Sequence, residues 1–272
     1  MKVTSWNILH AMTIPPDTTS DDLKSSALNE GLVTGLSEIK NFSPDVLGIQ
    51  EVDELQPRSA FMRQTEIIAK ELAAPYWAFA PTMMGTPGEQ WRALSDEERK
   101  FFHSGENLPA SYGIALISKI PVIRWHTLNL KKSPYGFPIA VPGKKRPQLI
   151  YVADEPRVAL AAELENGWTI ATTHLSFVPL YNVVQLRKLI RWLSALPGKK
   201  ILIGDMNLPW GIARRVSGWQ SFNSLPTYPS WKPQLEFDYI LSNDVRHEKV
   251  TTHRHQFSGI SDHLPLSIEI EL

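Results

Sequence analysis

The sequence predicts a mixed α/β fold. Eight short apolar segments bounded by turn residues have the length and the Val, Ile and Trp content of buried β-strands. Three longer segments repeat apolar residues every three or four positions, as amphipathic helices do. No Gly/Ser-rich linker divides the 272 residues, of which 43% are hydrophobic. We therefore expect a single domain, residues 1–272, with a sizeable core.

The predicted strands are spread along the whole chain. Each is a short apolar run, and the last alternates so that Leu266, Ile268 and Ile270 share one face. In chain order they are Val3–Ile8, Val46–Val52, Gly113–Ile117, Val158–Leu164, Trp168–Thr173, Lys200–Ile203, Phe237–Leu241 and Leu264–Leu272.

The three predicted helices lie between these strands. Pro44 follows soon after the first, and Pro197-Gly198 closes the third, as expected of residues that cannot continue a helix. Their apolar stripes are Leu32, Leu36 and Ile39; Phe61, Thr65, Ile68, Ala69 and Leu72; and Leu186, Leu189, Ile190 and Leu193.

Two long segments, 81–111 and 129–148, are predicted to be irregular. Loops of this length are commonly functional lids or disordered excursions. The second contains four prolines, no acidic residue and five basic residues, which are Lys131, Lys132, Lys144, Lys145 and Arg146. Such a segment could line a channel for a phosphate backbone or could be a solvated loop.

The overall composition excludes several classes of protein. Lys and Arg total 28, as do Asp and Glu, so a protein that coats DNA through bulk positive charge is disfavoured. The absence of cysteine excludes disulfides, thiolate zinc sites and cysteine nucleophiles. Neither a signal-like start nor a run of about 18 apolar residues occurs. We expect a soluble, cytoplasmic monomer without a membrane anchor.

Polar residues recur where the predicted strands begin or end. Strand ends are where α/β proteins place their sites, although a single Asn or Asp there is usually a turn residue. Together these positions hold four carboxylates, two histidines and two asparagines, a set that suits a hard cation bound through oxygen, such as Mg²⁺. The residues are Asn7, Glu51, His174, Asp205, Asn207, Asp238, Asp262 and His263.

The motifs that hold these residues occur in a familiar order. SWNI, IQEVD, THLSF, IGDMN, FDYIL and SDHLPL resemble the motifs of the endonuclease/exonuclease/phosphatase (DNase I-like) superfamily, from Val3 to Leu266. The resemblance implies a four-layer α/β sandwich in which two packed mixed β-sheets are flanked by helices. The strand ends would then converge on one edge and form the site.

The resemblance also implies a metal site. Glu51 would bind Mg²⁺ (or Mn²⁺), with Asn7 beside it as a ligand or an orienting group. Asp262 would complete the metal site or contact a metal-bound water. The ion would polarise the phosphorus through a phosphate oxygen.

The remaining residues acquire roles in water attack and phosphate binding. Asp205 would accept a proton from the attacking water, and Asn207 would orient that water or the phosphate. His263 would donate to the phosphate and Asp238 would hold its other ring nitrogen. His174 would be a second donor.

Two further residues are placed at the phosphate. Arg157, in EPRVALAAEL, would contact it bidentately. Tyr112 stands where some members carry a glutamate, and it either faces the site or packs.

These roles predict a divalent-metal-dependent phosphoester hydrolase, most directly a phosphodiesterase or nuclease acting on nucleic acid. A phosphatase or a sphingomyelinase-like lipid phosphodiesterase is the alternative within enzymes. A non-catalytic binding module is the alternative of another class. His247, His253 and His255 either form a zinc site or are exposed loop histidines. The loop aromatics Trp210, Trp219, Tyr228 and Trp231 either pack or bind a base or lipid.

Overall fold

The computed structural model describes residues 1–14, 31–87, 90–95, 97–98, 109–141, 148–222 and 225–271. Lys144, Lys145 and Arg146, which the sequence places in a basic segment, lie outside the described residues.

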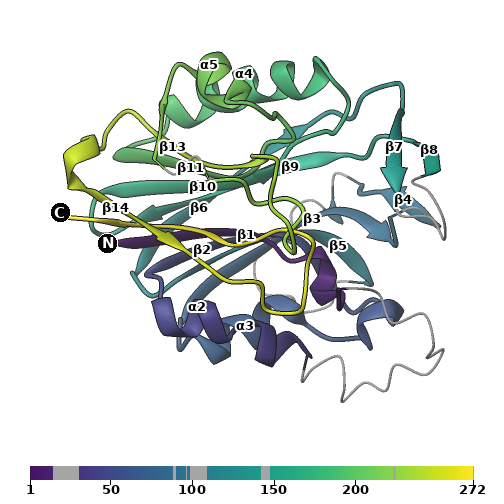
Figure 1. Ribbon diagram of the computed structural model, residues 1–272, viewed down its shortest axis with the longest axis horizontal. Helices are drawn as coiled ribbons and strands as arrows, with labels where there is room; N and C mark the ends of the chain where they lie inside the picture. Colours follow the sequence, from purple (N-terminus) through teal and green to yellow (C-terminus); the bar gives the residue numbers. More distant parts are fainter. Residues whose placement is uncertain are drawn as a thin grey trace.

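Two mixed β-sheets pack face to face (Figure 1). In spatial order the first contains β14 (Val250–Arg254), β15 (Leu266–Ile270), β1 (Lys2–Asn7), β2 (Val46–Glu54), β5 (Ser111–Ser118), β3 (Tyr76–Gly85) and β4 (Trp91–Ala93). The second contains β12 (Gln220–Ser221), β13 (Asp238–Ser242), β11 (Lys199–Asp205), β10 (Trp168–His174), β9 (Arg157–Leu164) and β6 (Val122–Leu130). One pair in each sheet, β1–β2 and β10–β11, is parallel.

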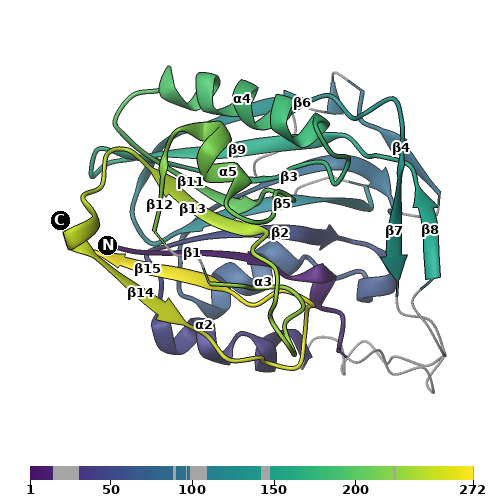
Figure 2. The ribbon, with the colours of Figure 1, turned by 45° about the horizontal axis from the view of Figure 1, so that its top comes forward.

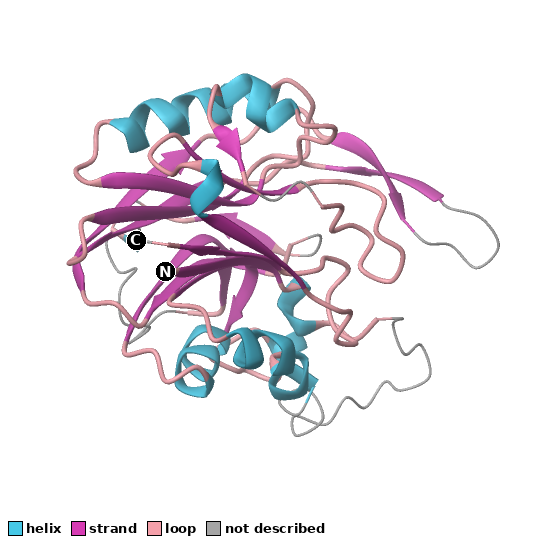
Figure 3. Ribbon diagram, turned by 60° about the vertical axis from the view of Figure 1, so that its left-hand side comes forward, coloured by secondary structure: helices cyan, strands magenta, loops and turns pink. Residues whose placement is uncertain are grey.

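Helices cover the outer face of each sheet (Figure 3). On the first sheet these are a helical turn at residues 31–35, α2 (Ser37–Phe42) and α3 (Gln64–Glu71). On the second they are α4 (Tyr181–Ser194) and α5 (Ile212–Ser217). Helix, sheet, sheet and helix form four layers, which confirms the predicted sandwich. No helix in the described part of the chain is long and apolar enough to cross a membrane.

The sandwich is held by strands that are buried on both faces. In β11, Ile201 and Ile203 point into the core between the sheets, whereas Leu202 packs under α4. In β2, Val46 belongs to the central core and Leu47 to the core beneath α2 and α3. Side chains alternate along a strand, so only an unbroken apolar run fills both layers, and this explains the patterns read from the sequence.

The predicted strands and helices are found close to their expected bounds, with one error. The second helical stripe was expected to include Phe61, but α3 begins at Gln64 and Phe61 is 65% exposed. Ala60 and Phe61 both have positive φ angles, of 54° and 57°, in the short 3-10 turn Pro57–Ser59 and the residues after it. A left-handed backbone cannot continue into an α-helix, so the helix starts later.

The two segments expected to be irregular are partly strand. Residues 81–85 complete β3, and β4 follows at residues 91–93. Leu130 completes β6, and the remainder of 129–148 contributes β7 (Phe137–Val141) to a hairpin with β8 (Gln148–Val152). This hairpin forms a sheet of its own and projects from the sandwich beside β4 (Figures 1 and 2).

Candidate active site

The strand register brings the polar strand ends to one edge of the sandwich. Asn7, at the end of β1, pairs with Gln50, the residue before Glu51 in β2. In the second sheet, Asp205 lies between His174 and Asp238, paired with the first in parallel and with the second in antiparallel register.

Asn7 joins the two sheets at this edge. Its amide nitrogen donates to Glu51 Oε1 at 2.9 Å and to Asp205 Oδ2 at 3.2 Å. Its Oδ1 accepts the backbone N–H of Leu9 at 3.1 Å. The amide nitrogen of Asn7 therefore faces the two carboxylates, a geometry that fits its orienting role.

The loop before β15 is held against the end of β1. Ser261 Oγ donates to Asn7 O at 2.6 Å and accepts the N–H of His263 at 3.1 Å. Trp6 Nε1 donates to His263 O at 3.0 Å. These bonds fix the direction of the two consecutive side chains Asp262 and His263.

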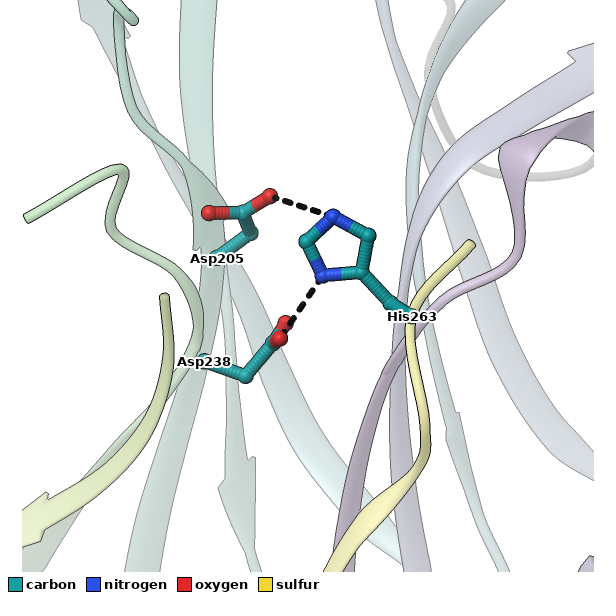
Figure 4. Close-up of side chains that lie close together, drawn as sticks. All are labelled: Asp205, Asp238 and His263. Carbon is teal, nitrogen blue, oxygen red and sulfur yellow. Dashed lines mark hydrogen bonds and ion pairs between the residues drawn. The ribbon is translucent and has the colours of Figure 1, made fainter. Parts of the chain in front are cut away.

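His263 and Asp238 form a tightly hydrogen-bonded pair (Figure 4). The Nδ1–H of His263 donates to Asp238 Oδ2 at 2.7 Å, and the same oxygen accepts the Thr227 hydroxyl. Burial alone would lower the pKa of His263, but the charge of Asp238 and its hydrogen bond, with the nearby Asp205 and Asp262, raise that pKa to about 10. The imidazole is thus a cation at neutral pH.

Asp205 faces the other nitrogen of this ring. Its Oδ2 lies 3.7 Å from His263 Nε2, and its Oδ1 accepts the N–H of Asn207 at 2.9 Å. Burial raises the pKa of Asp205 to about 7, against the opposing charge of His263. A carboxylate with such a pKa can accept a proton near neutral pH.

His174 is neutral and linked to Asn207. Burial, with the charges of Arg157 and His263, holds the pKa of His174 well below its usual value. Asn207 Nδ2 lies 2.9 Å from Leu175 O and 3.1 Å from His174 Nε2. Because the amide nitrogen is a donor, Nε2 accepts and the proton of the ring is assigned to Nδ1, which lies 3.9 Å from Glu51 Oε1.

Glu51 and Asp262 are the residues best suited to hold a divalent metal. Burial raises the pKa of Glu51, and so does repulsion between its carboxylate and that of Asp262. Asp262 Oδ1 is buried and has no hydrogen-bond partner among the described residues. An unpaired buried carboxylate oxygen beside a second carboxylate fits a hard cation that binds oxygen.

Asp205, Asp238 and His263 also lie within 4.8 Å of one another, as a metal-binding trio could. A protonated ring that donates through Nδ1 cannot ligate a metal, so we interpret this trio as a proton and charge relay. His247, His253 and His255 form no such group within the described residues, and the rings of His253 and His255 pack against Phe42 instead.

Arg157 and Tyr112 lie on the flank of Glu51, whose charge affects the pKa of both. Arg157 is buried over Phe177, and its Nε has no partner in the part of the chain that the structure describes. The ring of Tyr112 is buried, 5.5 Å beneath the Arg58 guanidinium. Both placements are compatible with the predicted phosphate contacts.

Sequence reasoning missed Glu155. Its Oε2 lies 3.7 Å from Arg157 Nη2, and its charge raises the pKa of Glu51. Burial raises the pKa of Glu155. Its place two residues before Arg157 was the available signal, because a buried arginine usually needs a carboxylate.

Two packed mixed sheets with acids, amides and a cationic histidine at one edge define a class of hydrolytic α/β sandwich. The sequence model of the Endonuclease/Exonuclease/phosphatase family matches residues 4–263, and the chain belongs to this family. Its members are hydrolases of phosphoester bonds and typically use a divalent metal.

Solved structures share the fold at low sequence identity. An endonuclease/exonuclease/phosphatase protein from Beutenbergia cavernae is 17% identical with a TM-score of 0.58, and the match covers 99% of this chain and 71% of the other protein's chain. The human Nocturnin catalytic domain is 18% identical with a TM-score of 0.56, and the match covers 100% of this chain and 94% of the Nocturnin domain. A mannosyl-6-phosphatase from Bacteroides thetaiotaomicron is 12% identical with a TM-score of 0.55, covering 100% of both chains. None of the curated proteins compared matches this chain in sequence.

Proposed function

We propose that this protein is a divalent-metal-dependent phosphodiesterase that cleaves its substrate by water attack. The observation that carries the proposal is the geometry around His263, whose Nδ1 lies 2.7 Å from Asp238 Oδ2 and whose Nε2 lies 3.7 Å from Asp205 Oδ2. Asp238 raises the pKa of the imidazole, and burial raises the pKa of the Asp205 carboxyl. One group is set to stabilise negative charge and the other to take a proton, and they face the same point.

Glu51 and Asp262 would hold Mg²⁺ or Mn²⁺, with Asn7 holding Glu51 in place through its amide. When bound, the ion would polarise the phosphoryl group and neutralise its developing charge.

The residues of this chain supply the other parts of the reaction. Asp205 accepts the proton of the attacking water and, through its hydrogen bond to the Asn207 N–H, is fixed in direction. His263 donates Nε2–H to a phosphate oxygen, and Asp238 keeps the ring cationic and oriented. His174 donates through Nδ1, and the Arg157 guanidinium contacts the phosphate.

Nucleic acid is the substrate class we propose to test first, with a phosphorylated small molecule or a lipid headgroup as the alternative. The fold is shared by a zebrafish TDP2 solved with a single-strand DNA product and by the mannosyl-6-phosphatase, so the fold alone does not select between them. A salt titration of activity separates the two, because hydrolysis of a polyphosphate backbone should fall steeply with added salt.

The experiment is hydrolysis of bis(p-nitrophenyl) phosphate with Mg²⁺ or Mn²⁺. Asp205→Asn and His263→Ala should each lower kcat by about 100-fold or more. Asp244→Asn and His126→Ala, outside the site, are the matched controls and should keep wild-type rates. Full activity of either site variant would refute the mechanism. Absence of turnover on every phosphoester, together with absence of metal binding, would favour a non-catalytic binding module.

A further inference from the structure

The hairpin of β7 and β8 carries a set of exposed apolar side chains. We call it the arm, defined as Tyr135, Phe137–Val141 and Gln148–Val152. Soluble proteins rarely expose large apolar side chains in one cluster, and such clusters usually mark an interaction surface. The exposed fractions are 73% for Tyr135, 40% for Phe137, 75% for Leu149, 44% for Ile150 and 69% for Tyr151.

The arm is apolar on both of its faces. Side chains alternate along β8, so Leu149 and Tyr151 share one face and Ile150 lies on the other. Phe137 pairs with Val152 and therefore shares the face of Ile150. A hairpin that docks on a folded protein needs one apolar face, whereas a hairpin that enters a lipid layer is surrounded by it. Two exposed apolar faces favour the second environment.

The base of the arm is fixed to the candidate active site. Ser133 N donates to Asp154 Oδ2 at 2.5 Å, and Asp154 Oδ1 lies 4.0 Å from Arg157 Nη2. Only four residues separate the end of β8 from Arg157, where β9 starts. The arm projects from the side of the sandwich toward which β1 and β2 run (Figure 2). Anything the arm binds is thereby brought beside the strand ends.

The charge of the segment selects the kind of surface. Residues 131–152 contain five basic residues and no acidic residue, and of these Lys131 and Lys132 are exposed at the base of the arm. Tyrosine rings favour the headgroup level of a bilayer, and basic residues near the surface are attracted by anionic lipids. Single-stranded nucleic acid would be bound by flat rings, which Tyr135, Phe137 and Tyr151 could supply, but it gives no partner to the exposed aliphatic side chains of Leu149 and Ile150.

We propose that the arm docks the protein peripherally on an anionic phospholipid membrane, inserting among the headgroups and placing the active site at the lipid surface. Strands of five residues reach about 17 Å, enough to enter the interfacial layer while the sandwich stays in water. Docking of this kind needs no membrane-spanning helix. The proposal concerns binding, so it stands or falls independently of turnover.

The test is sedimentation of the full chain with phosphatidylcholine vesicles, with or without phosphatidylglycerol. The wild type should bind the mixed vesicles, and added salt should weaken this binding. Leu149→Ser/Tyr151→Ser and Phe137→Ser/Ile150→Ser should each lower the partition coefficient by about tenfold or more. Ile123→Ser/Tyr76→Ser, which removes exposed apolar side chains at the opposite strand ends, is the control and should bind as the wild type does. An unchanged thermal midpoint shows that each variant is folded.

Three results would overturn the proposal. The first is a wild type that binds neither kind of vesicle, or arm variants that bind the mixed vesicles as strongly as the control variant does. The second is that the arm variants lose affinity for a single-stranded oligonucleotide while vesicle binding is absent, which would assign the arm to nucleic acid. The third is a wild-type dimer that the arm variants dissociate, which would assign it to a second copy of the chain.

Discussion

His255 is a buried histidine outside the active site, and lowering the pH should destabilise the protein through it. Its side chain is fully buried between β14 and α2, edge-on to Phe42 and 4.7 Å from the ring of His253. Nε2 is hydrogen-bonded to Ser267 Oγ at 2.6 Å, while Nδ1 has no hydrogen-bond partner among the residues described. Burial, followed by the charge of His253, lowers the pKa of His255 to about 4.

The sign and size of the effect follow from this pKa. In the unfolded chain the histidine takes up a proton near pH 6.5, and in the folded protein only near pH 4. Between these values the unfolded state binds more protons, so stability falls as the pH falls. Going from pH 7 to pH 5 should remove about 2 kcal/mol of unfolding free energy through His255 alone.

Urea unfolding at pH 7 and pH 5 measures this loss, with variants to isolate it from the titration of other groups. His255→Phe keeps a ring against Phe42 but cannot take up a proton, so it should lose about 2 kcal/mol less than the wild type on acidification. Ser267→Ala removes the hydrogen bond and keeps the buried imidazole, so it should show the wild-type loss. Equal losses in all three proteins would refute the reasoning. In that event Glu38, whose Oε2 lies 4.0 Å from Nδ1, pairs with the charged ring and offsets its burial.

Three further predictions concern the fold and the site. A Cβ added at Gly48 would lie 2.6 Å from Ile203 Cδ1 in the opposite sheet. Gly48→Ala should therefore lower the unfolding free energy, measured by urea titration, by about 1–3 kcal/mol. Gly31→Ala, where a Cβ meets nothing within 4 Å, should leave that free energy unchanged. Asp238→Asn removes the anionic partner of the buried His263 ring and should lower kcat at pH 7 by about 100-fold. A decrease smaller than about threefold would contradict the role of Asp238 in keeping His263 cationic. Chelation should abolish hydrolysis and Mg²⁺ should restore it, and Asp262→Asn should raise the Mg²⁺ concentration needed for half-maximal activity.

The strands that carry the site were predictable because their signal is local. Each is an apolar run buried on both faces, and most of the site residues stand at or beside a strand end, as Asn7 does in β1 and Asp205 in β11. Parallel register then places these ends together without further information from the sequence. The fold class, and the grouping of these polar side chains at one edge, could therefore be predicted from the sequence.

Strand β3 escaped prediction because its sequence contains Pro81. Proline lacks the N–H that a central strand normally donates, so it argues against strand structure. In the structure the register between β3 and β5 shifts between Pro81 and Met83. The unpaired residue of this bulge is Thr82, whereas Pro81 is paired with Gly113. Because β4 pairs only with residues 83–85 of β3, Pro81 lies where β3 is an edge strand in the described sheet, and proline is tolerated there. This compensation depends on the neighbouring strand, and a single segment of sequence does not reveal it.

The arm and Glu155 were missed for a different reason. Prolines and lysines made the segment look irregular, although Phe137 and Ile150 lie within its paired strands. Glu155 looked like a loop residue until the fold brought it to Arg157 and Glu51. Both features depend on packing between distant parts of the chain, and local propensity is a weak guide to such features.

The direction of the metal-binding side chains is also set by the fold. In a regular strand, neighbouring side chains point to opposite faces, and Gln50 points between the sheets, where its Nε2 donates to Thr172 Oγ1 at 2.8 Å. Glu51 would then point away from the site, toward α3. Instead β2 carries a bulge between Gln50 and Val52, and Glu51 has a φ of 58°.

The strained backbone therefore places the glutamate carboxylate at the edge of the sheets, 2.9 Å from Asn7 Nδ2. Asn207 and Ser261, with φ angles of 48° and 63°, are left-handed at the same edge. Each such residue costs about 1–2 kcal/mol, and the cost persists only where surrounding contacts impose it. Three of them at one edge mean that the strands must leave their regular path there to turn their polar side chains toward a common point. A sequence pattern identifies those side chains, but the bulge and the left-handed residues decide where they point.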